Sequence, residues 1–446
     1  MKVTPSKRKS TLHVVADDTA VASRAGSALL AELADRVGLT HELSRAMAPT
    51  RERRAGHDPG RVLRDLAVML ADGGDALCDL GALRDQPDLF GHVASDATAW
   101  RVIDAIDPER LGAIRDARAR ARGRAWALGM RPAALVLDVD ATLITSHSDK
   151  EGAAPTFKRG FGFHPILCHL DESGEALSAV LRPGNAGAND AHDNVTVLAE
   201  ALCQLPEHIR EDPATEILVR ADSAGASHDF LRAAREMGCR FSVGFELREP
   251  VREAILALPE AAWRSAVRQD GEEREGAWVA ELSLDLAGWP EGARAICRRE
   301  RPHPGAQLSF TDHEGHRFQV VLTDQEGDIV ALEARHRARA RAEDRIRCAK
   351  ETGLRNLPFR ELAPNAVWLE LMLIAQDLIA WAQALLLDGG LAVAEPKRLR
   401  YRLLHAAGRI TRSGRRVVLH LPARWPWAGA LVAAFRRLRA LPLPAG

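Results

Sequence analysis

The chain has few of the residues that build disulfide frameworks and zinc sites. Its six cysteines are scattered singly along 446 residues, without a CxxC pair or a paired histidine spacing. This pattern argues against both kinds of site and favours a reducing cytoplasm. The chain also has a single tyrosine, Tyr401, and no internal repeat or low-complexity block. A composition of 46% hydrophobic and 27% charged residues is ordinary for a soluble, folded protein.

A membrane span and a secretory leader are not evident either. The most apolar segment, residues 366–387, still contains four polar or charged side chains: Glu370, Gln376, Asp377 and Gln383. Such a segment is too polar for a comfortable span, so we expect a buried helix and no membrane partner. The start, MKVTPSKRKS, is basic but has no apolar segment behind it. We expect a basic flexible arm over residues 1–20.

The chain has no net charge, with 61 basic and 61 acidic residues. The basic residues are nevertheless unevenly placed. From Leu391 onward the only acid is Glu395, while the basic residues are Lys397, Arg398, Arg400, Arg402, Arg409, Arg412, Arg415, Arg416, Arg424, Arg436, Arg437 and Arg439. Local basic surfaces decide whether a phosphate backbone binds. This segment therefore predicts DNA affinity that falls as salt rises, with an arginine-rich solvated surface as the alternative.

Composition and hydrophobic spacing divide the chain into regions. Residues 21–130 carry Ala, Leu, Arg and Asp at helical spacing and predict a helical N-terminal DNA-binding region. Over residues 131–247, apolar runs of strand length mix with helical segments; the runs are 133–144, 164–171, 175–185, 216–225 and 239–247. The second and third runs predict a hairpin. Three strands followed by alternating strand and helix is the order of a ribonuclease-H-like sheet.

Residues 248–315 differ from the segments on either side. They contain three tryptophans, turn signals and short alternating segments, which predict a β-rich insertion. The core resumes over residues 316–390, and a basic region follows over 391–446. The predicted fold is α/β: a ribonuclease-H-like catalytic core interrupted by a β-rich insertion, between helical N-terminal and basic C-terminal regions.

Acidic residues end two of the predicted buried strands. Asp138 and Asp140 are two positions apart and point to the same face of the first strand. Asp222 ends another strand, so Asp140 and Asp222 meet at one sheet edge if the two strands are neighbours. Carboxylates at such an edge suit a pair of cations about 3.5–4 Å apart, as phosphoryl transfer on DNA needs.

A predicted helix supplies a third acid, Glu343. Four residues fall within an arc of roughly 60° on its face: His336, Arg339, Glu343 and Lys350. A carboxylate among basic groups suits a metal ligand beside phosphate contacts, and Arg345 and Arg347 add to the basic character of the segment. From spacing alone, a solvated helix with ordinary ion pairs is the alternative.

The pattern His336-x2-Arg339-x3-Glu343-x6-Lys350 resembles the Tyr-x2-Arg-x3-Glu-x6-Lys signature of the insertion-sequence 4 superfamily of bacterial DDE transposases. The likeness is closest to the insertion-sequence 1380 family. LVLDVDATLI, GFHPILCHLDESGEALSAVLRPGNAGAND and LVRADSAGAS resemble that family's first-Asp strand, its next two strands and its second-Asp segment. Helical and C-terminal segments match as well, in order from about residue 10 to the end; they include VASDATAWRVID, LPFRELAPNAVWLELMLIAQDLIAW and LPARWPWAGAL.

The resemblance implies a metal-binding catalytic triad of Asp140, Asp222 and Glu343. Asp138 is a candidate further ligand, or a group that orients the site. Two Mg²⁺ ions are expected, with Mn²⁺ able to substitute, because the ligands are carboxylates. Basic groups implied to contact DNA are His336, Arg339, Arg345, Arg347 and Lys350. His336 replaces the signature tyrosine, which predicts a weakened contact.

The resemblance also implies partners and a reaction. Water cuts the phosphodiester at the element's end, and the freed 3′-hydroxyl attacks target DNA in line. A homodimer would hold the terminal inverted repeats of an insertion sequence in the bacterial cytoplasm, associated with the nucleoid. If a DNA hairpin forms, an aromatic would stack on a displaced base. Trp263, Trp278 and Trp289 are candidates, although packing is the expected role of each.

Two alternatives stay open at this stage. DVDATLI also matches the Asp-x-Asp-x-Thr motif of haloacid-dehalogenase phosphatases, with Asp138 as nucleophile and Asp140 as acid/base. That fold continues with a helix and parallel strands, whereas this chain predicts a hairpin. A decayed or domesticated transposase that binds DNA without cutting it is the second alternative, and the three intact acids argue against it.

Overall fold

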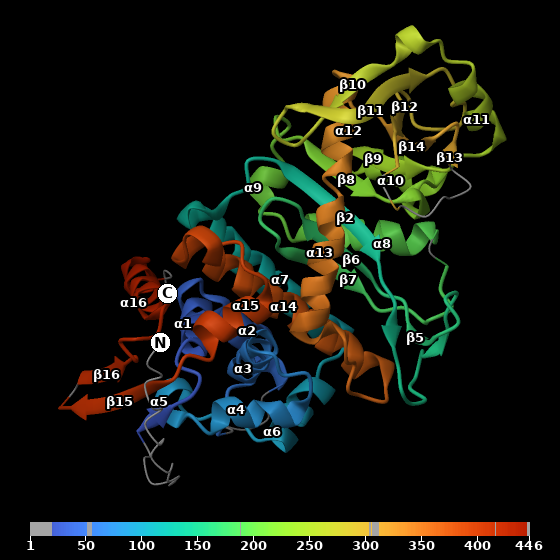
Figure 1. Cartoon of the computed structure of the whole chain (residues 1–446). Coiled ribbons are helices and arrows are strands. Elements are labelled where there is room, and N and C mark those ends of the chain that lie inside the picture. Colours follow the sequence, from blue (N-terminus) through green and yellow to red (C-terminus); the bar gives the residue numbers. More distant parts are fainter. Residues whose placement is uncertain are drawn as a thin grey trace, which may run out of the picture.

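The structure is a computed structural model of the whole chain, and it describes residues 20–50, 56–187, 189–302, 305, 312–414 and 416–443 (Figure 1). The expected basic arm, apart from Ala20, and Arg415 of the basic C-terminal segment lie outside the described residues.

A mixed ten-stranded sheet forms the centre of the molecule. Its order is β10-β11-β12-β14-β9-β8-β2-β6-β7, with β13 paired to β14. The strands are β2 Leu135–Ala141, β6 Ile166–Leu170, β7 Ala176–Val180, β8 Ile217–Ala221, β9 Cys239–Phe245, β10 Arg264–Val267, β11 Glu273–Leu282, β12 Arg294–Glu300, β13 Asp312–His313 and β14 His316–Thr323. The α/β class is therefore confirmed.

Pairing around β2 distinguishes between the alternatives left open by the sequence. β6 and β7 form the predicted antiparallel hairpin, and β6 is antiparallel to β2. β8 lies parallel to β2 on its other side, followed by parallel β9. An antiparallel strand directly beside β2 contradicts the all-parallel order that the phosphatase interpretation requires.

The tryptophan-bearing segment extends the same sheet. β14 pairs antiparallel with β9, and β12, β11 and β10 continue the ladder outward to the upper end of the molecule in Figure 1. The segment also contains α11 (Glu249–Leu256). It is rich in β-structure, and it is joined edge to edge with the central strands through continuous hydrogen bonding.

Helices cover both faces of the central strands. Asp138, Asp140 and His169 project from one face, where α12 (Ile329–Arg337), α13 (Ala340–Ala349) and α14 (Leu362–Leu386) pack. On the other face Ser178 donates to the carbonyl of Val197 in α8 (Ala191–Cys203), at 2.7 Å. α10 (His228–Glu236) packs beside α8. Successive side chains of a strand point to opposite faces of the sheet, so the helices on the two faces contact different strand residues.

The N-terminal and C-terminal segments pack around α14. Contacts join it to α1 (Ser27–Arg36), α3 (Pro59–Asp72), α7 (Pro108–Ala125) and α16 (Ala428–Ala440). Other elements of these two segments include α2 Leu39–Ala46, α6 Asp96–Asp104, β1 Val21–Ala22, β15 Gly408–Ser413 and β16 Arg416–His420. By length and composition α14 resembles a membrane span, but 83% of its most apolar window is buried inside the protein. It is the expected buried helix.

A buried ion network explains the acids within that apolar helix. Arg122 of α7 lies 2.5 Å from Asp377 of α14 and 3.0 Å from Glu175. Arg118, also on α7, pairs with Asp377 at 3.1 Å and with Glu370. All of these side chains are buried. Since breaking a buried pair leaves an uncompensated charge, the network fixes the N-terminal helices against the core.

Candidate active site

Asp140 and Asp222 lie at the same end of two neighbouring strands. In the parallel pairing of β2 with β8, Asp138 is opposite Arg220. Two positions further along each strand, the same register brings Asp140 beside Asp222, with both side chains on the face of Asp138. Asp140 lies near the end of β2, and Asp222 directly follows β8. The two strand ends therefore bring these carboxylates together.

Glu343 joins them from the helical layer. It lies in the first turn of α13, which packs across β2 and β6. The pKa of Asp140 is raised to about 6: burial is the main cause, Arg339 opposes it, and the negative charges of Asp222 and Glu343 add to it. The three carboxylates from three elements thus share one electrostatic environment.

Arg339 is the cation that faces these acids. Its Nη2 lies 3.1 Å from Oδ1 of Asp140, and its buried Nε has no hydrogen-bond partner. An unpartnered buried N–H can donate to a further anionic oxygen, such as that of a phosphate. Within the described ranges, no three Asp, Glu, His or Cys side chains are grouped closely enough to hold one metal ion.

Asp138 is engaged elsewhere. Its two oxygens accept hydrogen bonds from Nε and Nη2 of Arg220, both at 2.7 Å, and the pair is almost fully buried. Arg220 also lies 3.0 Å from Asp171, which is held in turn by Arg341 at 2.5 Å. Asp138 is therefore an ion-pair partner beneath Asp140 and Asp222.

The helix that carries Glu343 is interrupted, and the expectation of one continuous face is wrong. α12 ends at Arg337 and α13 begins at Ala340, with a turn between them. His336 Nδ1 lies 2.9 Å from the hydroxyl of Ser242, and burial lowers the pKa of His336 to about 3. His336 is thus neutral at physiological pH. Lys350 begins the wider turn that follows α13.

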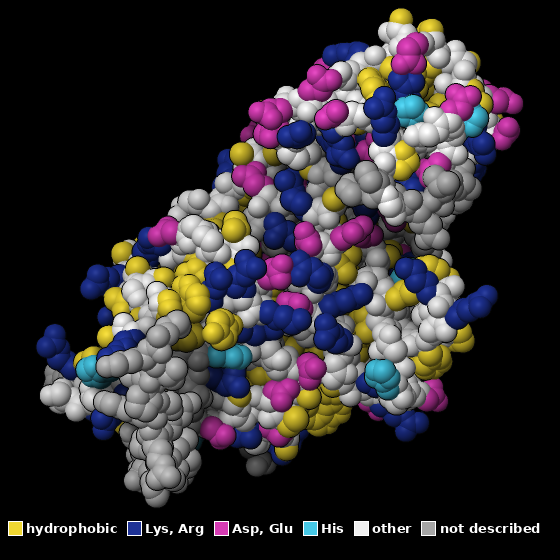
Figure 2. Space-filling model, viewed as in Figure 1, with side chains coloured by type: hydrophobic (Ala, Val, Ile, Leu, Met, Phe, Trp, Pro, Cys, Tyr) yellow, Lys and Arg dark blue, Asp and Glu magenta, His cyan; other side chains and the backbone are white. Residues whose placement is uncertain are grey.

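An open cavity of about 840 Å³ adjoins the acids. Asp222, Glu343 and Arg339 line it together with His336. Further basic side chains on its walls are Arg248, Arg298 and Arg337. In Figure 2, Lys and Arg side chains gather over α13 and its surroundings, interleaved with Asp and Glu. The hollow therefore offers both carboxylates and cations to a ligand that carries phosphates.

Sequence comparison identifies the family. A family described as "Transposase DDE domain group 1" matches residues 4–443, almost the whole chain. The chain belongs to this transposase family. No curated protein matches it by sequence. Among solved structures it is similar to a piggyBac transposase synaptic complex with hairpin DNA, at 11% identity and a TM-score of 0.41, covering 86% of this chain and 80% of that one. A likeness this weak supports no conclusion about fold or partner.

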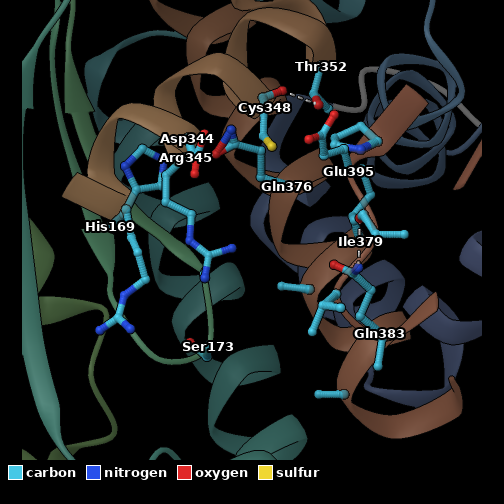
Figure 3. A pocket seen from close by; sticks show the side chains of 18 of the residues that line it. His169, Ser173, Asp344, Arg345, Cys348, Thr352, Gln376, Ile379, Gln383 and Glu395 are labelled. Atoms are coloured by element: carbon cyan, nitrogen blue, oxygen red, sulfur yellow. Dashed lines mark hydrogen bonds between the residues drawn. The ribbon is translucent and has the colours of Figure 1, made fainter. Parts of the chain in front are cut away.

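Arg345 and Arg347 of this transposase do not face the three acids. Both line a separate cavity of about 490 Å³ between α13, α14 and the β6–β7 turn (Figure 3). Nη2 of Arg345 donates to the carbonyl of Asp171 at 3.2 Å, and Arg347 lies 3.0 Å from both Asp344 and Glu395. The structure therefore separates them from Arg339, although all three belong to one basic stretch of sequence.

The three tryptophans of the transposase are engaged in packing. The guanidinium of Arg299 lies 4.4 Å from the ring of Trp263 and 4.9 Å from that of Trp278. Trp289 stacks on His228 with ring centroids 4.0 Å apart. Each indole is only partly exposed. These contacts agree with the packing role expected for each.

Sequence reasoning missed Arg220 and Asp171 as supports of the acid pair. The segment Arg220-Ala221-Asp222 holds a signal that points to Arg220, because residues two apart on a strand share a face. Asp171 gives no such local signal. It follows β6 and reaches Arg220 only because β6 and β8 flank β2 in the folded sheet.

Proposed function

We propose that this transposase cuts and rejoins DNA at the ends of a mobile element, with Asp140, Asp222 and Glu343 as its catalytic acids. We further infer that the strands β7-β6-β2-β8-β9 form a ribonuclease-H-like core. Their order, with an antiparallel hairpin on one side of β2 and parallel strands on the other, supports that assignment. The signature in α12 and α13 supports a place in the insertion-sequence 4 superfamily, nearest the 1380 family.

The observation that carries the proposal is that carboxylates from β2, the end of β8 and α13 share one electrostatic environment. Burial raises the pKa of Asp140 to about 6, and folding gains nothing from the negative charges of Asp222 and Glu343, which add to that shift. Carboxylate oxygens are the ligands that hard divalent cations prefer, so the chemistry of these three side chains fits Mg²⁺ or Mn²⁺. Two such ions would stabilise charge on the attacking and leaving oxygens of the phosphodiester.

The protein's own groups then have separate tasks. Nη2 of Arg339 pairs with Asp140, and its unpartnered Nε is available to a phosphate of the DNA. Neutral His336, held by Ser242, lines the same cavity without adding charge. The buried Asp138–Arg220 pair holds the two strand ends in register below the acids. Lys350 contributes a cation at the end of α13.

Duplex DNA is the proposed partner, as terminal inverted repeats and as target. The β15–β16 hairpin and α16 carry exposed arginines for non-specific backbone contact, and this binding should weaken steeply with salt. We also propose a homodimer that bridges two element ends, acting in the bacterial cytoplasm at the nucleoid.

Cleavage of a duplex that carries the repeats flanking the encoding gene tests the proposal. Wild type should nick the repeat boundary with Mg²⁺ or Mn²⁺, and Glu343→Gln should bind the duplex without nicking it. Asp344→Asn is a matched control, since this neighbouring acid lines the separate cavity beyond α13 and pairs with Arg347. Equal nicking by wild type and Glu343→Gln would overturn the triad. Binding without cutting by every variant, wild type included, would indicate a repurposed DNA-binding protein.

A further inference from the structure

A small three-stranded sheet stands beside the acids. It consists of β3 (Ile144–Thr145), β4 (Ala154–Pro155) and β5 (Phe161–Phe163), at the right of Figure 1. The chain enters it three residues after β2 ends, and leaves it directly before β6. The backbone N–H of Thr142 donates to Pro165 at 3.0 Å, which keeps both ends at the sheet edge that carries Asp140.

The tip of this hairpin, residues 156–160, is held by its own hydrogen bonds. Thr156 N–H donates to the carbonyl of Gly160 at 2.8 Å, and Gly160 N–H donates to the hydroxyl of Thr156 at 3.1 Å. Arg159 has φ 61°, in the left-handed region that closes a tight turn. At the base, Leu362 N–H donates to Glu151 at 2.7 Å. The tip is therefore preorganised, and the base of the hairpin is anchored to the first residue of α14.

The tip presents an aromatic ring to solvent. Phe157 is 68% exposed, whereas the three tryptophans are only partly exposed and packed. Its ring centroid lies 5.6 Å from that of His164, which precedes β6, and Lys158 Nζ lies 5.7 Å from the same ring. An exposed, preorganised ring beside a cation is the surface on which a nucleobase stacks.

Cations around the tip lack acidic partners. Within the described part of the chain, no carboxylate lies at ion-pair distance from Lys158, Arg159, Lys350 or Arg355. Lys158 and Arg355 are close enough to lower the pKa of Lys350, although burial is the larger cause. Most other arginines near α13 are paired, as Arg341 is with Asp171 and Arg347 with Glu395. Clustered, unpaired positive charges favour a polyanionic ligand.

We propose that the hairpin tip grips the DNA end that enters the active site, with Phe157 stacked on an unpaired terminal base. Lys158, Lys350 and Arg355 hold the phosphates on either side of that base. This inference rests on the proposed transposase function, and it goes beyond it by assigning base contact to Phe157 in place of the tryptophans.

Binding to element-end DNA with a frayed terminus tests the inference. The probe is the duplex described above with 2-aminopurine at an unpaired terminal position, compared with the fully paired duplex. Phe157→Ala should weaken binding of the frayed probe by about five- to 150-fold, the range expected for one base stacked on an aromatic ring, with a much smaller effect on the paired duplex. Phe157→Tyr should restore binding, and stacking should quench the 2-aminopurine in wild type but not in Phe157→Ala.

Charge variants test the phosphate contacts separately. Lys158→Ala should weaken both probes alike and reduce the slope of log affinity against log salt by about 1. Arg232→Ala is the matched control, because it removes one exposed positive charge from α10, where Arg232 pairs with Asp229. Its salt slope should equal that of wild type.

The outcomes separate the two proposals. If wild type cuts repeat DNA while Phe157→Ala binds frayed and paired probes as wild type does, the hairpin inference fails and the transposase function stands. An unchanged salt slope in Lys158→Ala also refutes the phosphate contact. If wild type neither binds nor cuts the repeats, the proposed function itself fails.

Discussion

Asp140→Asn should stabilise the metal-free protein while abolishing cleavage. The pKa of Asp140 is raised from 3.8 to about 6. Between these values the folded protein keeps a proton that the unfolded chain releases, so the free energy of unfolding falls as pH rises through this window. The loss is complete above about pH 6 and amounts to about 3 kcal/mol, since one pH unit corresponds to about 1.4 kcal/mol. Asparagine has no charge to bury, so the free energy of unfolding of the variant does not fall in this pH range.

Urea unfolding in a chelator, at neutral pH and near pH 4, measures the effect. At neutral pH, Asp140→Asn should be more stable than wild type by about 2–3 kcal/mol. Near pH 4 the two proteins should be much closer, because Asp140 is then protonated in the folded wild type. Mg²⁺ at about 100 times its Kd should add about 2.7 kcal/mol to wild type and much less to the variant.

Two results would refute this reasoning. One is an Asp140→Asn protein that is no more stable than wild type at neutral pH in the chelator, which would mean that the carboxylate cluster is not destabilising. The other is equal stabilisation of both proteins by Mg²⁺. Asp344→Asn provides the background, since its side chain is 69% exposed and its ion pair should contribute less than about 1 kcal/mol.

Two further predictions concern the packing around the site. Arg122→Met should lower the free energy of unfolding by about 3–5 kcal/mol in urea, because it leaves Glu175 buried without its arginine and Asp377 with Arg118 alone. The exposed Arg232→Met should change the free energy of unfolding by less than about 0.5 kcal/mol. Native-state alkylation read by mass spectrometry should modify exposed Cys78 and Cys203 first. Cys239 and Cys297 should react only after unfolding, because burial raises the pKa of each thiol to about 12. Early alkylation of either would contradict their placement.

The sequence by itself determined features that depend on short segments. Apolar runs that end in acids mark β2 and β8, because strands buried on both faces need continuous hydrophobic side chains. The hairpin of β6 and β7 follows from two such runs around a turn. Residues 366–387 were predicted as a buried helix from their polar members, and Asp377 and Glu370 are indeed partners of buried arginines.

Only the tertiary structure decided which side chains meet. Asp138 and Asp140 have the same local pattern, and the pairing of β2 with β8 places Arg220 against one of them and Asp222 beside the other. Arg339 and Arg345 lie in one basic stretch, yet they line different cavities. Register and helix packing come from contacts between residues far apart in the chain, so no local window contains them. Phe157 is more exposed than any tryptophan. This difference in exposure also depends on contacts between residues far apart in the chain.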